Sequence, residues 1–342
     1  MKYFREHIDE FSKIYKESEN YIIFNDGKPI RENILNEEDV EVSLDESLDP
    51  RDICEVERCD AEKKLIKNAK FNVNVKIHKP LQLKLIHLND DEATVTFSFE
   101  IDPKIEVKII DIYTRVDIKS HILNEILVND RAKLDYFSFS RCEKSIEHKM
   151  NVYIDSRANV NLYNLMANED EYRFNCNVYL FDKFSKLNQY NTLINNTKKD
   201  QEFTYKVHHL AKSSISQMRN NAICNSDSFI VINTDGIIKK DAIETDLNQK
   251  IKGILLDEKS NIIANPVLHI DEYDCKAGHG AGVGAIDEAD LFYLMSRGIE
   301  KNDAVKLIVY GYIEPVISFV KEDEELTNYI SEIIFKKIWL IL

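Results

Sequence analysis

The pattern of apolar and polar positions changes twice along the chain and divides it into three parts. Between residues 71 and 285, short runs such as FNVNVKIH, LQLKLIHL and ATVTFSFEI alternate apolar and polar residues. This period of two is typical of strands that bury one face. We therefore predict a mainly β domain over residues 71–285.

The turns between these strands favour one kind of β architecture. The chain contains neither glycine nor proline between Pro103 and Gly236, so asparagine, aspartate, serine and lysine must form the corners. Side chains of this kind bond the local backbone and suit the corners of a β-solenoid, whose coils stack on one another. The sequence therefore favours a solenoid over a sandwich with glycine- and proline-rich turns.

A weak internal repeat supports stacked coils. Val160, Leu187, Ile215 and Ile243 lie in similar local sequences and are 27, 28 and 28 residues apart. With one coil per repeat, these four residues would form a ladder in the interior. A chance coincidence in an asparagine-rich chain is the alternative.

The parts before and after the β domain are expected to be different. Residues 1–70 read as a helical or irregular segment: a short helix from Tyr3 to about Tyr15, an exposed acidic stretch over 32–52, and a helix-like run over 56–69. Residues 286–342 read as a helical domain, whose apolar tail, too short to span a bilayer, fits a packed helix.

The start of the helical domain has clear helix-boundary signals. Asp287 is expected to cap a helix that runs from about Glu288 to Arg297, and Gly298 stands where a left-handed C-terminal residue belongs. A second helix is expected from about residue 302, and a third after the acidic run KEDEE.

Charge and composition narrow the class of partners and the compartment. The formal net charge is −15 and lysines form no basic stripe, so nucleic acid is an unlikely partner. No secretory signal and no membrane-spanning apolar window is visible, which predicts a cytoplasmic protein without membrane insertion. The six cysteines form no CxxC pair, so they are expected to be mainly reduced core residues.

The segment GHGAGVG, residues 278–284, contains four of the nine glycines and invites a nucleotide-binding interpretation. No lysine followed by serine or threonine stands after the last glycine, which excludes a Walker loop. Gly280, Gly282 and Ala285 fit a dinucleotide fingerprint, but helices follow where a second parallel strand is required.

A metal site is the remaining chemical interpretation of this segment. His279 is flanked by glycines, and Cys275 lies four residues before it, so that an imidazole and a thiolate could bind iron or zinc. On a strand, residues an even number apart share one face. In the alternative, the glycines only turn the last coil toward the helices and His279 caps that turn.

The run NPVLHIDEYDCKAGHGAGVGAIDEADLFYLMSRGI, residues 265–299, closely resembles the signature of the SufB/SufD proteins. These are scaffold subunits of the SUF iron–sulfur cluster assembly system. The following run DAVKLIVYGYIEPVI, residues 303–317, resembles the family's next element. The resemblance implies a right-handed parallel β-helix core with a short helical N-terminal segment and a small C-terminal helical domain.

The resemblance also implies partners and a role. In this family two scaffold subunits pair through the ends of their β-helices, and each helical domain docks an ABC-type ATPase. We therefore expect a non-catalytic scaffold that pairs with a B-type subunit and handles a transient iron–sulfur cluster shared with that partner. The sequence leaves open whether a flavin associates.

Individual residues follow from the same resemblance. His279 matches the family histidine at the subunit interface, whereas Gly280 and Ile251 stand where B-type chains have Glu and Cys, which favours the D type. Some D-type chains have a cysteine at the position of Ala277, two residues from Cys275. The residues expected to contact the ATPase are Asp287, Leu291, Phe292, Arg297 and Tyr312.

Two alternatives stay open at this stage. One is a minimal homodimeric scaffold that resembles SufB and has no separate B-type partner. The other is an enzyme that acts on polysaccharides, because many β-helix proteins cleave acidic polysaccharides. The second is disfavoured by the missing secretion signal and by the absence of a visible acid–base cluster.

Overall fold

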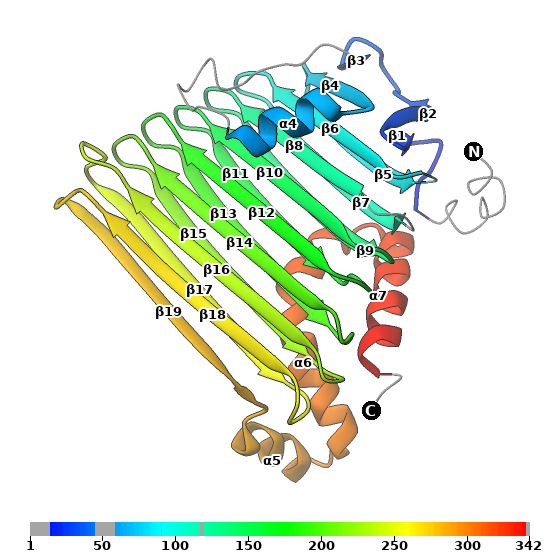
Figure 1. Cartoon of the computed structure of the whole chain (residues 1–342), viewed down its shortest axis with the longest axis vertical. Helices are drawn as coiled ribbons and strands as arrows, with labels where there is room; N and C mark the ends of the chain where they lie inside the picture. The colour runs from blue at the N-terminus through cyan, green and yellow to red at the C-terminus, as the bar shows by residue number, and fades with distance from the viewer. Residues whose placement is uncertain (1–13, 45–58, 90, 117–119, 340–342) are drawn as a thin grey trace.

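The protein is a β-solenoid of about seven turns with helices at its side (Figure 1). The computed structural model describes residues 14–44, 59–89, 91–116 and 120–339. The fold confirms the predicted mainly β architecture with C-terminal helices. The alternating pattern that predicted half-buried strands is the pattern that lets consecutive coils stack.

Each coil contributes one strand to each of two sheets. The ten-stranded sheet contains, in spatial order, β19 (Cys275–Ala285), β17 (Thr245–Leu255), β15 (Ile215–Cys224), β13 (Lys186–Asn195), β11 (Asn159–Met166), β9 (Lys133–Cys142), β7 (Glu106–Val116), β5 (Leu81–Asn89), β1 (Asn20–Asn25) and β2 (Lys28–Asn33). The nine-stranded sheet contains β18 (Asn261–Ile270), β16 (Phe229–Ile238), β14 (Asp200–His209), β12 (Tyr172–Leu180), β10 (Ile146–Ile154), β8 (Ser120–Val128), β6 (Ala93–Ile101), β4 (Phe71–Ile77) and β3 (Val40–Leu44). Neighbouring strands are parallel except in the pairs β1–β2 and β3–β4.

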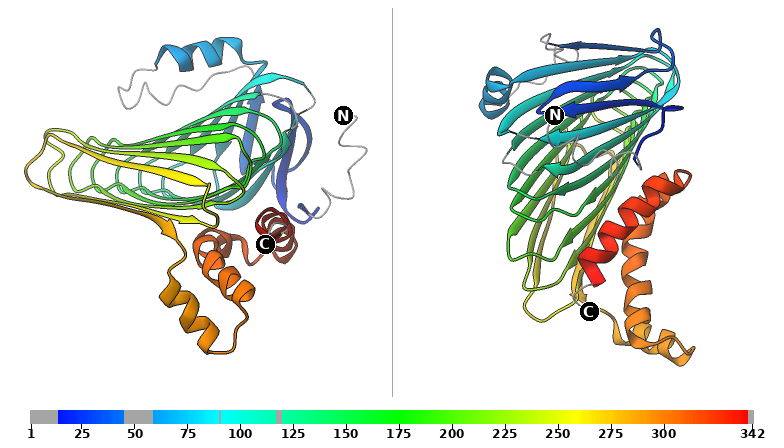
Figure 2. Two further views of the ribbon diagram at one scale, coloured as in Figure 1. Left: turned by 60° about the horizontal axis from the view of Figure 1, so that its bottom comes forward. Right: turned by 90° about the vertical axis from the view of Figure 1, so that its right-hand side faces the viewer.

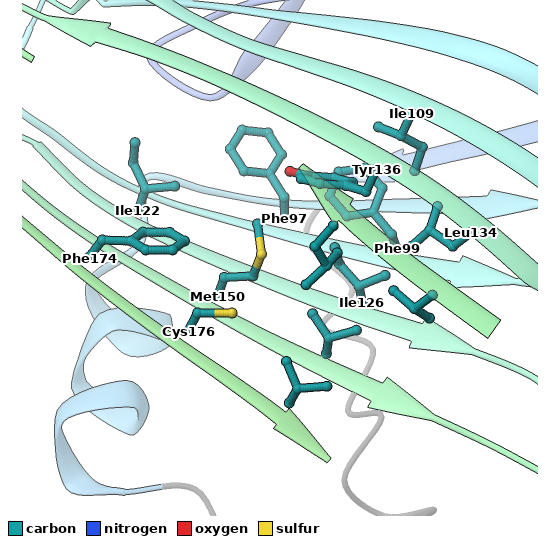
Figure 3. Close-up of a cluster of buried hydrophobic side chains, with 14 of the residues drawn as sticks. Phe97, Phe99, Ile109, Ile122, Ile126, Leu134, Tyr136, Met150, Phe174 and Cys176 are labelled. Carbon is teal, nitrogen blue, oxygen red and sulfur yellow. The ribbon is translucent and has the colours of Figure 1, made fainter. Parts of the chain in front are cut away.

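Alternate side chains of both sheets point inward and form one continuous apolar core. Figure 3 shows part of it, where Phe97, Ile126, Met150 and Phe174 from successive coils lie against each other. These side chains are almost completely buried. Burial of apolar surface at about 25 cal/mol per Å² is what stabilises the stack, since no coil could bury its inner face alone.

The predicted ladder of four residues is correct for one step and wrong for the other two. Val160 pairs with Leu187, and both are buried. Leu187 then pairs with Ser216 rather than with Ile215, and Ile243 lies in a corner with 38% of its surface exposed. The coils lengthen toward the C-terminus, so a constant spacing of 28 residues loses the register.

The corners use left-handed backbone at residues other than glycine. The backbone φ angle lies between 56° and 62° at five such corner residues, namely Arg131, Arg157, Phe184, Ser213 and Glu244. Each donates its backbone N–H to a carbonyl of the next coil, for example Arg157 to Lys183 at 3.0 Å. This bond offsets the cost of a positive φ in a side-chain-bearing residue. The corners therefore include arginine and phenylalanine beside the predicted polar types.

The N-terminal part differs from the predicted helical or irregular segment. Residues 20–44 contain β1, β2 and β3, which extend both sheets at the first coil. Most of β1 is buried, although its sequence NYIIFN is too short to show a period. The predicted helix over residues 3–15 falls largely outside the described residues. The helix-like run over 56–69 contains α4 (Asp60–Asn68), which lies on the nine-stranded sheet (Figure 2).

Three helices follow the last strand, namely α5 (Glu288–Ser296), α6 (Lys301–Ile317) and α7 (Glu324–Trp339), with a 3-10 turn η1 (Ser318–Val320) between the last two. Helices α6 and α7 lie beside the ten-stranded sheet, whereas α5 stands away from the solenoid (Figure 2). A second apolar core, which includes Ile194, Ile223, Val309 and Ile313, fills the space between sheet and helices. Among the described residues, no helix is both long and apolar enough to cross a membrane.

Two buried lysines anchor the helical domain to the solenoid. The ammonium group of Lys84 in β5 is 1% exposed and bonds the carboxylates of Glu19 and Asp323 and the carbonyl of Ile14. Lys337 in α7 donates to the carbonyl of Asn168 at 2.7 Å and pairs with Glu169 at 3.0 Å. Desolvated charge pairs thus connect residues 14–19 and the helical domain to the solenoid, and removal of one partner from such a pair is costly.

Candidate functional site at the open end of the solenoid

The glycine-rich segment forms the last strand and not a turn. Residues 275–285 are continuous β19, and none of its glycines has a positive φ. The four glycines alternate along the strand and all face outward, opposite Asn248, Lys250, Lys252 and Ile254 of β17. The interpretation in which the glycines turn the chain toward the helices and His279 caps that turn is therefore wrong. The strand ends at Ala285, and Asp287 caps α5 by accepting a bond from the Ala289 N–H at 2.8 Å.

His279 occupies the last position of an interior row. Successive coils place on this row Leu83, Ile109, Tyr136, Leu162, Gln189, Met218, Gln249 and His279. Every earlier member is buried because the next coil covers it, but His279 is exposed because no coil follows among the described residues. The imidazole thus lies at the mouth of the solenoid interior.

The neighbour of His279 on this row adds a polar group. Gln249 is 1% exposed and accepts a hydrogen bond from the Thr234 hydroxyl at 2.9 Å. Its amide nitrogen is buried and has no hydrogen-bond partner, which is unusual for a buried donor. At the open end, the His279 imidazole therefore lies next to the buried amide donor of Gln249, among mainly apolar side chains.

Cys275 shares the inward face of β19 with His279 but lies far from it. Four residues of extended strand separate their Cα atoms by about 13 Å, so one metal ion cannot bind both side chains. The thiol donates to the Glu272 carbonyl at 3.3 Å. Burial and the carboxylates of Glu272 and Asp274 raise the pKa of Cys275, which favours the neutral thiol over the thiolate that binds metals.

Within the described residues, no other ligand set replaces this pair. Among residues 14–44, 59–89, 91–116 and 120–339, no group of three or more His, Cys, Asp or Glu side chains lies close enough to hold a metal ion. Cys142, Cys176 and Cys224 are buried, and burial raises the pKa of both Cys176 and Cys224 to about 12. These thiols behave as the core residues that were expected.

The last coil also leaves two strand edges open. Within the described residues β18 pairs only with β16, and β19 pairs only with β17. The two edge strands are ten and eleven residues long and together contain one charged residue apart from histidine, Lys276. Long edges with few charges are those that pair with another chain.

Apolar side chains surround these edges. In β18, Ile263, Val267 and Ile270 are 41%, 39% and 44% exposed, and in β19 Val283 is 39% exposed. Tyr273, in the corner between the two strands, is completely exposed. The terminal coil therefore combines unpaired backbone with exposed apolar surface.

The residues expected to contact an ATPase fall into two groups. Asp287, Leu291, Phe292 and Arg297 belong to α5 or its ends, and α5 has no buried residue. Phe292 is 74% exposed, and the Arg297 guanidinium lies 5.2 Å from the Tyr293 ring centre. Tyr312 in α6 is half-buried and faces the solenoid, where its carbonyl accepts bonds from Thr192 and Asn221 at 3.1 and 2.9 Å.

Sequence reasoning missed several features of this end. It did not find the apolar edges, the position of His279 at the end of an interior row or the amide of Gln249. The alternation of CKAGHGAGVGA, with glycine at every second position, was the available signal for a strand.

Fold and site together define a class of protein: a β-solenoid that is closed by extra strands at one end and open at the other, with a helical domain at its side. Comparison with known proteins gives the family. The family model described as "SUF system FeS cluster assembly, SufBD core domain" matches residues 89–312. The chain belongs to this family, and its relatives named SufD place it with the D type.

Three relatives illustrate the similarity. The iron-sulfur cluster assembly protein SufD of Bacillus subtilis is 26% identical over 255 residues, which are 72% of this chain and 58% of the relative. SufD of Escherichia coli is 33% identical over 86 residues, or 25% of this chain and 20% of the relative. A SufBD family protein of Archaeoglobus fulgidus is 37% identical over 87 residues, or 25% and 24%. The chain thus spans little more than half the length of the Bacillus protein. This family leaves the polysaccharide-enzyme interpretation without support.

Proposed function

We propose that this chain is a non-catalytic, cytoplasmic scaffold subunit of iron–sulfur cluster assembly that pairs with a B-type scaffold through its open terminal coil. The observation that carries the proposal is the asymmetry of the solenoid: its interior row ends on the exposed His279 in β19, one of two strands whose outer edges are open within the described residues. A partner that adds strands to β18 and β19 would pair the backbone, apart from Pro266 in β18, which has no N–H, and would cover the apolar rim.

His279 is the residue of this chain that acts on the cargo. Its imidazole is a suitable ligand for iron, and the partner must supply the other ligands because Cys275 is about 13 Å away. The cluster is the substrate of the assembly and is held at the junction of two subunits. The apolar rim excludes water from that junction once the subunits pair.

The helical domain is the proposed docking site for an ABC-type ATPase. Helix α5 has no fully buried residue: Leu291 is half-buried and Phe292 is 74% exposed. An exposed apolar helix face of this kind fits a groove on a partner. The two buried lysines and the second core connect this domain to the solenoid, so movement of the ATPase would be transmitted to the open end.

The test of this proposal is anaerobic co-expression with a B-type scaffold and an ABC ATPase, followed by iron and sulfide analysis of the purified complex. We expect His279→Ala to form the complex but to lose most of its bound iron and sulfide. His269→Ala is the matched control, because His269 is an exposed histidine on the outward face of β18. Equal iron and sulfide content in both variants would contradict the role of His279.

Docking of the ATPase is tested separately with Phe292→Glu. The side chain is 74% exposed, so the variant is expected to fold normally and to lose ATPase binding in a pull-down. Leu35→Glu, at an apolar residue near the other end that is 59% exposed, is the control.

The same co-expression separates the two scaffold arrangements. Pairing of the chain with itself, and not with the B-type subunit, would favour the homodimeric alternative.

A further inference from the structure

A groove of about 390 Å³ lies between α6 and the outward face of the ten-stranded sheet, one strand in from the edge strand β19. Strands β13, β15 and β17 form its floor and α6 forms its wall. Its lining includes Tyr190, Arg219, Lys250, Lys252 and Tyr312. The volume is in the range of small-molecule sites.

Three cations meet on the floor of this groove. Arg219 and Lys250 are directly opposite on neighbouring strands, about 5 Å apart along the sheet, and Lys252 is two residues further along β17. Like charges in such positions destabilise a sheet. None of the three side chains forms an ion pair within the described part of the chain. In a protein of net charge −15, this local cluster of positive charge without an ion-pair partner favours the binding of an anion.

One of the cations is held in a fixed position. Tyr163 and Tyr190 stack with ring centres 5.4 Å apart, and the Arg219 guanidinium lies 5.4 Å from the Tyr190 ring centre. A guanidinium stacked in this way loses little additional freedom when it binds an oxyanion. The site is therefore partly preorganised.

A glycine in α6 leaves part of this wall of the groove without a side chain. Gly311 lines the groove in the interior of α6, where glycine destabilises a helix by about 1 kcal/mol relative to alanine. A Cβ atom at this position would meet nothing within 4 Å, so no packing contact requires the glycine. The backbone of Tyr312 is fixed to the sheet by Thr192 and Asn221, which keeps the wall at a constant distance from the floor.

We propose that this groove binds an organic phosphate of mononucleotide size. The phosphate group would bind Arg219, Lys250 and Lys252, as charge-assisted bonds to these side chains favour such oxyanions. The flat part of the ligand would lie along Tyr312 and Pro315 on α6. Asp290 of α5 is the acidic group near Tyr312, and it forms no ion pair with the three cations. The proposal is independent of the proposed pairing and cluster assembly.

The test is isothermal titration of the full chain at low salt with four probes: AMP, ribose 5-phosphate, adenosine and inorganic phosphate. We expect AMP to bind more tightly than either phosphate lacking the base, and adenosine not to bind. The double variant Lys250→Gln, Lys252→Gln removes two charge-assisted bonds and should weaken AMP binding by at least about tenfold.

Two further variants separate binding from folding. Lys186→Gln with Lys212→Gln removes the same charge from exposed lysines elsewhere in the solenoid and should leave AMP affinity unchanged. Gly311→Leu should fill the groove, abolish AMP binding and raise the melting temperature, because leucine favours the helix. Absence of AMP binding to the wild type at millimolar concentration, or equal affinity in the double lysine variant, would overturn the proposal. Inorganic phosphate binding as tightly as AMP would overturn the assignment of an organic ligand.

Discussion

The two ends of the solenoid differ in how far their outermost strands are protected from pairing with another chain. At the first coil, β2 forms the outer edge of the ten-stranded sheet and has the sequence KPIREN, with Lys28, Arg31, Glu32 and a proline. Charges and proline prevent an edge strand from pairing with other chains. At the last coil, β19 has the sequence CKAGHGAGVGA with one lysine, and β18 contains Pro266 but no charged residue apart from histidine. The ten-stranded sheet therefore ends in a protected edge at the first coil and in a nearly uncharged edge at the last.

The largest expected effect is at the closed end, where Lys84 joins the N-terminal segment to the start of α7. Lys84→Met leaves the carboxylates of Glu19 and Asp323 without their buried cation. We expect the free energy of unfolding to fall by about 3–5 kcal/mol in urea titrations. Lys186→Met, at an exposed lysine, is the control, and an equal effect of both variants would show that the buried cation contributes nothing specific.

Two side-chain truncations compare how well the interior is covered near the first coil and at the last coil. Ile109 is completely buried in β7, and Ile109→Ala is expected to destabilise the protein by about 2–5 kcal/mol. Val283 lies on the inward face of β19 but is 39% exposed, so Val283→Ala should cost less than about 1 kcal/mol in the isolated chain. Chemical denaturation measures both. A cost for Val283→Ala as large as that for Ile109→Ala would mean that the last coil is already covered.

The closed interior also predicts how stability depends on pH. Burial lowers the pKa of His148 to about 3, and that of His209 also to about 3. Because the unfolded chain takes up these protons near pH 6.5 and the native state does not, stability is lost as pH falls from about 6.5 toward 3. Each histidine should reduce it by about 2 kcal/mol at pH 5.

The variant His148→Phe tests this dependence. It should reduce the slope of unfolding free energy against pH by about 1.4 kcal/mol per unit between pH 6 and 4, whatever it does to stability at pH 7. Met150→Leu, a volume-conserving change in the same strand, should keep the wild-type slope. An unchanged slope in His148→Phe would show that the native state accepts the proton.

The sequence was sufficient for the architecture but not for its register. Alternation predicted the strands, and the cap at Asp287 and the left-handed Gly298, with φ of 87°, confirmed the start and end of α5. The ladder failed at Ile215 because the coils lengthen at their corners, and corner length has no periodic signal. The strands over 20–44 were missed because β1 is too short to show a period, and because short edge strands with polar residues, such as β2 and β3, resemble irregular chain.

The candidate site was predicted less completely than the fold. The motif singled out His279 and Cys275, and strand parity correctly placed both on one face. Only the three-dimensional arrangement shows that their separation excludes a shared ion and that the open row ends on His279. The exposure of His279 depends on which coil is the last, and the local sequence pattern does not contain that information.

Hydrogen–deuterium exchange tests whether the open terminal coil is the surface that pairs with the B-type scaffold. In the isolated chain the edge amides of β18 and β19 should exchange rapidly, since no strand covers them among the described residues. Addition of the B-type scaffold should protect residues 261–285 and leave residues 28–44 unchanged. Protection of residues 28–44 without protection of residues 261–285, in a complex that does form, would contradict the account.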